Sequence, residues 1–374
     1  MRVALVVAGP YPALRGSQVL VRQLERGLGA RGHDVDVIAY GVPDGVAPPG
    51  PRPARLLHDI HLVARLWRHV RRHATDVIHA HNYEGAVAGL VVARALGRPL
   101  IYHGHSALAE ELPTWVARRG SRRALRAVGR LLDRLVPCRA DYCIAVTEEL
   151  GRLLEEAGVA MASLDCIVPA GGEDVGPPPR SYGGTEPTAL VCYAGNLDGY
   201  QNLGFLQAVF ARVRARLPEA RLMLVTHDPR PVRHVGRLVD GVDLVAAPSY
   251  DAVRRRLEAA HVVVCPRIER SGFPMKLLNY MAAGKAIVAC AGSAKGLIDG
   301  VNGRVVADGD VGGFAAAIGE LLGDASVRAR LGAAARQAVD DPRAWEHALD
   351  RIERIYRLVL EARQPAVVPV AVPE

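Results

Sequence analysis

The chain contains very little lysine. Only three of its 47 basic residues are lysines, and these three, Lys276, Lys285 and Lys295, fall within one short stretch. Aromatic residues are also scarce, at 5%, and the arginine excess is spread along the sequence. A module that recognises nucleic acid needs stacking aromatics or a concentrated basic motif. We therefore expect no nucleic-acid partner, despite a formal net charge of +8.

Long apolar runs and paired cysteines are missing as well. No stretch approaches the roughly 18 uninterrupted apolar residues of a membrane span, so no transmembrane helix is expected. The apolar run at residues 3–7 is short and lacks a cleavage signature, so it predicts a first buried strand rather than a signal peptide. The six cysteines form no Cys-x-x-Cys pair, which argues against a disulfide framework and a zinc ribbon. Together these absences favour a cytoplasmic protein.

Two nucleotide-binding motifs are absent. No Gly-x-Gly-x-x-Gly sequence follows the first predicted strand, so a dinucleotide-dependent dehydrogenase loses its main support. Gly284 and Lys285 have no glycine at the P-loop spacing and precede an alanine, so ATP hydrolysis is equally unsupported. The two Asp-x-Asp triplets, at 34–36 and 308–310, fall in a predicted strand and a predicted turn, so neither indicates a metal-diphosphate site.

The residues that are present alternate between short β-branched runs and longer helical patterns, which is typical of parallel α/β units. A chain of 374 residues exceeds the roughly 250 to 300 residues of one hydrophobic core, so we expect two domains. The Pro- and Gly-rich run at 171–187 predicts a linker between an N-terminal domain, 1–170, and a C-terminal domain, 188–345. A helix at 346–362 is expected to cross back to the first domain, before a disordered tail at 363–374.

The individual elements are predicted from composition and spacing. Strands are expected at 3–7, 35–39, 76–80, 100–102, 142–146, 189–193, 222–225, 242–245, 262–265 and 286–289. Helices are expected between them, for instance at 18–30, 85–95, 203–216 and 252–259.

Two arginine-rich stretches of helical pattern, 52–73 and 117–140, hold much of the basic surplus of the first domain. The first has an apolar stripe beside its arginine face. Two interpretations remain open: a helix docked on the first sheet, or a basic face that rests on anionic lipid at the inner face of the membrane. The stripe consists of Leu56, Ile60, Val63, Trp67 and Val70.

The segment 262–310 carries the pattern most informative about function. A buried strand at Val262–Cys265 leads into a polar loop, Arg267–Gly272, and then into a helix that begins near Phe273 and Pro274. A loop and a helix N-terminus at the carboxyl end of a parallel strand form the place where α/β proteins hold phosphate. Lys276, in the first helical turn, can add a full positive charge there, the alternative being a solvated helix lysine.

This segment resembles the donor-site region of the GT-B glycosyltransferases, and in detail that of the retaining family 4 enzymes. Its matching motifs are Gly272-Phe273, Met281-Ala282-Ala283-Gly284, Ala286-Ile287-Val288 and Asp299-Gly300-Val301-Asn302-Gly303. Further matches run in order along nearly the whole chain, at Gly16-Ser17, Gly32-His33-Asp34-Val35, Asp76-Val77-Ile78-His79-Ala80-His81, His105 and Ala194-Gly195-Asn196-Leu197. The resemblance implies an α/β fold of the GT-B type, with two facing Rossmann-like doubly wound parallel sheets and a cleft between the domains.

The resemblance also implies an activity. It indicates transfer of a hexosyl group from a nucleotide-diphosphate sugar, with a UDP-sugar favoured, to a hydroxyl of a glycan, a glycolipid or a secondary metabolite. Transfer would retain the anomeric configuration and would need neither a bound metal nor another cofactor. The leaving phosphate itself would accept the proton of the acceptor, so no side-chain base is required.

The chain departs from the family at four charged donor anchors. An Arg and a Lys that usually grip the diphosphate are replaced by Asn196 and Gln201. Two glutamates that usually hold the sugar and the ribose are replaced by Ser271 and Asn279. All four replacements are polar and neutral, so the usual donor geometry must be supplied by other residues.

Nearby residues can restore what was lost. We expect Lys276 and Arg267 to hold the diphosphate, Glu269 to reach the sugar, and Asn279 to bind the ribose. The catalytic residues implied in this way are His105, Glu269 and Lys276. The donor-binding residues are Gly16, Asn196, Gln201, Arg267, Ser271, Gly272, Phe273 and Asn279, and the acceptor-side residues are Asn82, Tyr83, Glu84 and His103.

Histidines spaced by two residues support a different hypothesis, a metal site. His79 with His81, and His103 with His105, each share one face of a strand, and with Glu84, Glu110 and Glu111 they could bind zinc in a metal-dependent hydrolase. No fixed spacing such as His-Glu-x-x-His supports that site, so we expect no metal. Two further alternatives lie within the GT-B fold: a catalytically silent binding subunit and a nucleotide-sugar epimerase.

Overall fold

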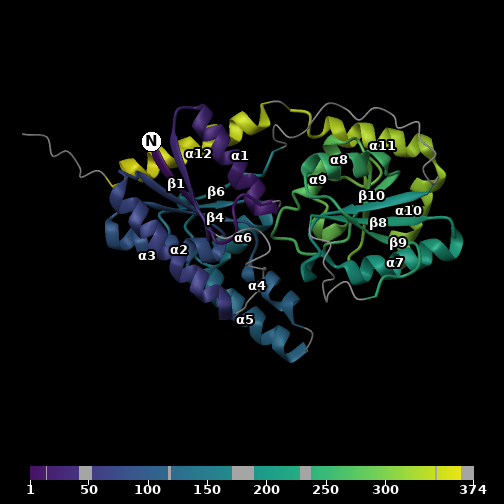
Figure 1. Ribbon diagram of the computed structural model, residues 1–374, viewed down its shortest axis with the longest axis horizontal. Helices are drawn as coiled ribbons and strands as arrows, with labels where there is room; N and C mark the ends of the chain where they lie inside the picture. Colours follow the sequence, from purple (N-terminus) through teal and green to yellow (C-terminus); the bar gives the residue numbers. More distant parts are fainter. Residues whose placement is uncertain are drawn as a thin grey trace, which may run out of the picture.

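The computed structural model describes residues 1–13, 15–41, 53–116, 119–170, 189–227, 237–341 and 343–363. They form two α/β lobes side by side, each built on a six-stranded parallel sheet (Figure 1). The α/β expectation of two doubly wound sheets is thereby confirmed. The predicted linker at 171–187 lies outside the described residues, as does the predicted tail apart from Arg363.

The first sheet has the strand order β2-β1-β3-β4-β5-β6. Its strands are β1 (Arg2–Val7), β2 (Asp34–Ile38), β3 (Val77–His81), β4 (Leu100–Gly104), β5 (Tyr142–Ala145) and β6 (Leu164–Cys166). All five strands predicted for this domain are present, within two residues at either end. The prediction missed β6, a three-residue edge strand that is only half-buried, because it has no long β-branched run.

The second sheet repeats this design with the order β12-β11-β10-β7-β8-β9. Its strands are β7 (Leu190–Ala194), β8 (Arg221–Thr226), β9 (Val242–Ala246), β10 (Val262–Cys265), β11 (Ala286–Cys290) and β12 (Arg304–Val306). The five predicted strands are again present. The one that was missed, β12, is another three-residue edge strand.

Helices pack against both faces of each sheet. In the first domain they are α1 (Gly16–Ala30), α2 (Pro53–Arg72), α3 (Asn82–Leu96), α4 (Leu108–Glu111), α5 (Arg119–Leu135) and α6 (Glu148–Glu156). In the second they are α7 (Leu203–Arg216), α8 (Tyr250–Ala259), α9 (Lys276–Ala282), α10 (Val311–Gly323) and α11 (Ala325–Gln337). Every helix in the described part of the chain is too short or too polar to serve as a membrane span.

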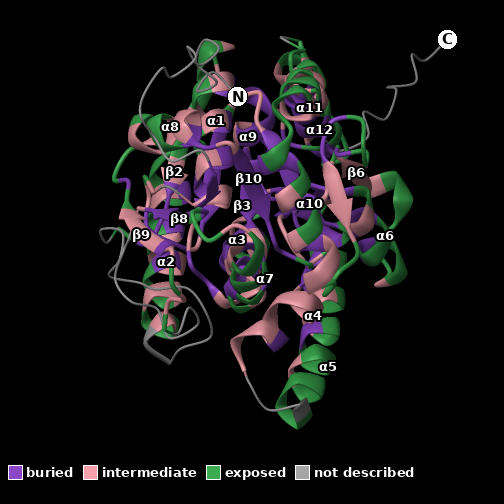
Figure 2. Ribbon diagram, turned by 90° about the vertical axis from the view of Figure 1, so that its right-hand side faces the viewer, coloured by how far each residue is buried: buried purple, intermediate pink, exposed green. Residues whose placement is uncertain are grey.

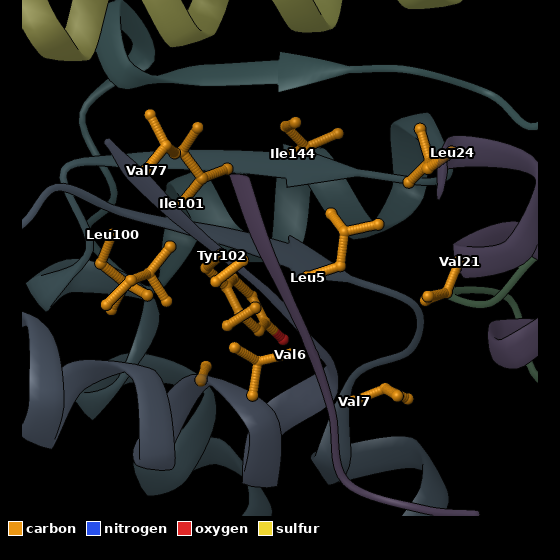
Figure 3. Close-up of a cluster of buried hydrophobic side chains, with 14 of the residues drawn as sticks. Leu5, Val6, Val7, Val21, Leu24, Val77, Leu100, Ile101, Tyr102 and Ile144 are labelled. Carbon is orange, nitrogen blue, oxygen red and sulfur yellow. The ribbon is translucent and has the colours of Figure 1, made fainter. Parts of the chain in front are cut away.

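The last helix, α12 (Ala344–Glu361), follows the second domain in sequence but packs on the first. Its buried residues Ile352, Ile355 and Tyr356 belong to the same apolar core as Leu5 and Ile101 of the first sheet. That core fills the space between the strands and the surrounding helices (Figures 2 and 3). The chain therefore closes back on itself, and α12 joins the two lobes.

The buried face of α2 agrees with the predicted stripe only in part: Val70 is buried and Val63 and Trp67 pack against the core. Leu56 and Ile60 of that stripe are 63% and 55% exposed, whereas Leu62 and Leu66, which were not part of it, are fully buried. Leu62, Leu66 and Val70 are spaced by four residues and share one helical face, so α2 packs on the first domain through a face that overlaps the stripe only toward its C-terminal end. Helical spacing alone admits two neighbouring faces here, and tertiary packing selects between them.

Candidate active site

Two adjoining cavities lie between the domains, where the carboxyl ends of the two sheets face each other. Cavity 1 has a volume of about 250 Å³ and cavity 2 a volume of about 210 Å³. Both domains contribute to the boundary between them. Its residues are Arg15 and Gly16 from the first domain and Asn196, Tyr200, Arg267, Phe273 and Met275 from the second.

The first domain supplies the wall of cavity 1 from residues that directly follow its strands. Asn82, Tyr83 and Glu84 form the first turn of α3, immediately after β3, and His105 follows β4. Because β3 and β4 are parallel neighbours, their carboxyl ends bring these side chains to one edge of the sheet. Asn82 has a φ of 60°, a left-handed conformation that asparagine adopts more readily than most residues.

The second domain supplies the loop between β10 and α9. We expected a helix from about Phe273, but regular helix begins only at Lys276. The preceding residues form a tight turn in which Leu277 N donates to Pro274 O at 2.8 Å. The expected helix start was therefore wrong by about three residues, and the seven-residue helix α9 is too short to act as an anion site by itself.

Lys276 lies in the wall of cavity 2 and bonds a neutral partner. Its Nζ donates to Gln201 Oε1 at 2.7 Å and lies 3.9 Å from the centre of the Tyr193 ring. Removal from water, the largest cause, lowers the pKa of the ammonium to about 7. A positive charge that is removed from water and held by an amide and a ring is poised to accept an anion.

Gly195 makes room for this ammonium. It has a φ of +155°, and a Cβ at this position would lie 2.9 Å from Lys276 Nζ. Asn196, next in sequence, accepts a bond from Gln201 Nε2 at 2.9 Å through its Oδ1. Asn196 and Gln201, at the positions of the expected Arg and Lys, thus form an amide chain that orients Lys276.

Arg267 brings a second cation to the boundary of the cavities. It is 8% exposed, and its guanidinium lies over the Tyr200 ring at 5.2 Å. Its Nε lies 3.4 Å from Glu269 Oε2, yet neither atom has a hydrogen-bond partner among the described residues. Burial is the largest cause that raises the pKa of Glu269, and the charge of Arg267 opposes it. Both side chains retain hydrogen-bonding capacity for a ligand in cavity 1.

Ser271 is placed differently from its expected role in donor binding. The residue is fully buried, and its polar groups bond the first domain. Ala107 N donates to Ser271 Oγ at 2.9 Å, and Ser271 N donates to Glu110 Oε2 at 2.9 Å. Thr147 Oγ1 donates to the carbonyl of Ser271 at 2.7 Å. Ser271 borders cavity 1, but its contacts make it a link between the domains.

The other residues that we expected to bind the donor line one or both cavities, with the single exception of Gly272. Asn279 lines cavity 2, where its Oδ1 accepts a bond from Tyr250 at 3.4 Å. Gly272 is not among the described residues that line either cavity. A Cβ on Gly272 would lie 3.0 Å from His105 O, so its role is to let the two domains approach.

The four histidines form one cluster under cavity 1. His81 Nδ1 and His105 Nε2 are 3.1 Å apart, and so are His79 Nε2 and His103 Nδ1. Burial lowers the pKa of His105 to about 4, so this imidazole is neutral at physiological pH. His103 was expected on the acceptor side, but it is 1% exposed and is not among the described residues that line either cavity.

Three of these histidines could hold a metal ion. His79, His81 and His103 each offer one nitrogen, and the three nitrogens lie within 4.8 Å of one another. His79 Nδ1 also bonds Tyr356 of α12 at 2.7 Å. His79, His81 and His103 are buried, and none of the three is among the described residues that line either cavity.

Several residues that line the cavities were not predicted from the sequence. Arg15 forms an ion pair with Asp198 across the domains at 3.1 Å, and Arg55 lies 3.5 Å from Glu84. Arg15 directly precedes the Gly16-Ser17 motif, which was a usable signal. Arg55 belongs to a stretch interpreted as a surface helix, and no local pattern shows that its side chain turns inward. Trp115 also lines cavity 1.

Comparison with known families agrees with this geometry. The profile of Glycosyltransferase Family 4 matches residues 14–168, and the profile of Glycosyl transferases group 1 matches residues 188–324. The chain belongs to the GT-B glycosyltransferases of family 4. The first profile spans five of the six strands of the first sheet, all but β1, and the second spans all six strands of the second sheet.

Known proteins resemble this glycosyltransferase over nearly its whole length. The phosphatidyl-myo-inositol mannosyltransferase of Mycolicibacterium smegmatis is 25% identical over 96% of this chain and 94% of its own. Sucrose-phosphate synthase from Thermosynechococcus elongatus superimposes with a TM-score of 0.79 at 20% identity, over 96% and 99% of the two chains. Anabaena HepE in complex with UDP-glucose gives a TM-score of 0.69 at 17% identity, over 95% and 100%. The two solved structures confirm the GT-B fold.

Proposed function

We propose that this glycosyltransferase moves a hexosyl group from a UDP-sugar to an acceptor hydroxyl, with retention of configuration and without a metal ion. The observation that carries the proposal is Lys276, whose ammonium faces cavity 2 with a neutral amide as its hydrogen-bond partner. A diphosphate there would supply the missing negative charge. The similar HepE protein was solved in complex with UDP-glucose, which supports the choice of donor.

The donor would span both cavities. The nucleoside would occupy cavity 2, with Asn279 at the ribose, and the diphosphate would lie between Lys276 and Arg267. The sugar would then enter cavity 1, where Glu269 can bind its hydroxyls. Arg267 borders both cavities, so in this arrangement it would lie at the junction of phosphate and sugar.

The two cations would act on the leaving group. As the bond between the anomeric carbon and the phosphate oxygen breaks, negative charge grows on the diphosphate and positive charge on the sugar ring. Lys276 and Arg267 would stabilise the former. The neutral His105 can donate a hydrogen bond to the sugar without adding positive charge beside it. The leaving phosphate would accept the acceptor proton on the face from which it departs.

The acceptor would enter cavity 1 from the first domain. Asn82, Tyr83 and Glu84 line this side, and Trp115 offers an aromatic surface on which a sugar or polyol ring can stack.

The cysteines, all free and mostly buried, are consistent with the reducing cytoplasm proposed for the chain.

Donor binding and turnover can be tested separately. Calorimetry with UDP-sugars should show binding, and release of UDP with an acceptor panel should show transfer whose product keeps the anomeric configuration of the donor. Binding without any UDP release would favour the catalytically silent subunit. Conversion of the donor sugar without UDP release would favour the epimerase. Absence of binding to every nucleotide sugar would overturn the proposal.

A further inference from the structure

Helix α5 projects from the first domain and leaves much of its surface exposed. Figure 1 shows it pointing away from both sheets, and Figure 2 shows its free end exposed. Its inner face packs on α4, where a Cβ on Gly129 would lie 2.5 Å from Ala109 N. Asp133 on the same face accepts hydrogen bonds from Leu108 N at 2.9 Å and Ala109 N at 3.0 Å. The outer face is therefore free for another contact.

An apolar line runs along this outer face. Val128, Leu131 and Leu135 are spaced by three and four residues, which places them on one side of the helix. They are 45%, 55% and 37% exposed, respectively. An exposed apolar line on a projecting helix indicates a surface that is covered in the working state of the protein.

A line of arginines runs beside the apolar one. Its members recur at three and four residues, all are exposed, and none has an ion pair among the described residues. The single acidic residue of α5, Asp133, is turned inward to α4. The outer face therefore carries uncompensated positive charge. The line consists of Arg123, Arg126, Arg130 and Arg134.

We propose that α5 docks this glycosyltransferase on an anionic lipid bilayer. The apolar line would enter the headgroup region, and the arginines would bond lipid phosphates, for which a guanidinium is well suited. The charge of this face favours a lipid bilayer over a second copy of the chain as the partner of α5. A second copy of the chain would bring the same arginines against these, and like charges repel, whereas an anionic bilayer neutralises them.

Docking through α5 would place the acceptor cavity beside the membrane. The helix packs on α4 and on the short helix η1 (Leu112–Trp115), and residues of both line cavity 1. The acceptor class that follows is a hydroxyl borne by a lipid headgroup, a step that rests on the proposed function. The similar mannosyltransferase of Mycolicibacterium smegmatis is named for a phosphatidyl-inositol substrate, which is compatible with this class.

Vesicle binding by the full chain tests the proposal. The parent should bind vesicles of phosphatidylcholine with phosphatidylglycerol, lose binding as salt rises, and ignore pure phosphatidylcholine. The double variant Arg126→Gln with Arg130→Gln should bind roughly 30-fold more weakly. The matched control, Arg212→Gln with Arg216→Gln on the exposed face of α7, removes the same charge and should bind like the parent. Equal binding by both variants would overturn the proposal.

Orientation is tested with the chain carrying Trp67→Phe and Trp345→Phe, which leaves Trp115 as the one tryptophan. Brominated lipid in bound vesicles should quench its fluorescence, and unchanged fluorescence of vesicle-bound protein would overturn the docking geometry. A dimer that Leu131→Ser dissociates, without any vesicle binding by the parent, would also overturn it. UDP release measured without vesicles reports on the proposed function independently, so the two failures are distinguishable.

Discussion

Replacement of Lys276 by methionine should separate donor affinity from protein stability. Burial lowers the pKa of Lys276 from 10.5 to about 7. This shift means that folding disfavours the charged form of the lysine, relative to its neutral form, by at most about 5 kcal/mol, because water in the cavity reduces the cost of desolvation. The unliganded variant should therefore be at least as stable as the parent near neutral pH. Donor binding should weaken by about 2 kcal/mol, or roughly 30-fold, because a charge-assisted bond to the diphosphate is lost.

The same lysine makes donor affinity depend on pH. In the free enzyme Lys276 is charged below its pKa of about 7 and neutral above it, whereas the bound diphosphate favours the charged form. Affinity should therefore be constant at lower pH and fall by about tenfold for each pH unit above about 7. Calorimetry in buffers of different ionisation enthalpy should show uptake of nearly one proton on binding at about pH 8.

Lys285 provides the matched control. It is the other lysine with a pKa lowered by burial, to about 8, but its Nζ donates to Glu258 O at 2.7 Å and Ala260 O at 2.9 Å. Lys285→Met should lower the melting temperature, because two carbonyls lose their donor, and leave donor affinity unchanged. If Lys276→Met binds the donor like the parent, or if the affinity shows no fall above neutral pH, the assignment of Lys276 to the diphosphate is wrong.

Three further outcomes follow from the site. Glu269→Gln should lower kcat by about tenfold or more, with little change in donor affinity, because the carboxylate acts on the sugar rather than on the nucleotide; equal effects on kcat and on donor Kd would contradict this. Glu110→Gln should raise the donor KM several-fold, because Glu110 Oε2 accepts hydrogen bonds from Ser271 N and Ser271 Oγ and so orders the loop between β10 and α9. The control Glu148→Gln, at an exposed position, should leave the donor KM unchanged. Extended treatment with a strong chelator should leave the transfer rate unchanged, and a loss restored by zinc would favour the histidine-based hydrolase.

Much of the fold could be predicted from the sequence because it follows local rules. Eight of the ten predicted strands are buried and mostly apolar, the exceptions being β2 and β9, and a parallel sheet covered on both faces requires such apolar runs. Edge strands such as β6 and β12 are short and half-buried, so composition does not distinguish them from loops. The buried face of α2 was predicted only in part, because Leu62 and Leu66 lie beside the predicted stripe and two of its members, Leu56 and Ile60, are exposed.

The positions of several candidate site residues follow from the sequence, whereas their contacts do not. Lys276 and Arg267 do lie on the cavity walls, since they flank a loop whose position follows from strand order. Ser271 was assigned to the donor, but Glu110 and Ala107 of the other domain hold it. Such contacts join residues more than 150 positions apart, and no local pattern encodes them.

By itself the sequence determined that this protein has two parallel α/β halves, a polar loop between one buried strand and a helix, and three lysines concentrated in the second half. Only the tertiary structure decided what each lysine does. Lys276 faces cavity 2 beside a neutral amide, Lys285 bonds the carbonyls that end α8, and Lys295 pairs with Glu149 of the first domain at 2.8 Å. The physical reason is that the pKa and partner of a lysine depend on the water and charges around its Nζ, which packing between distant segments sets.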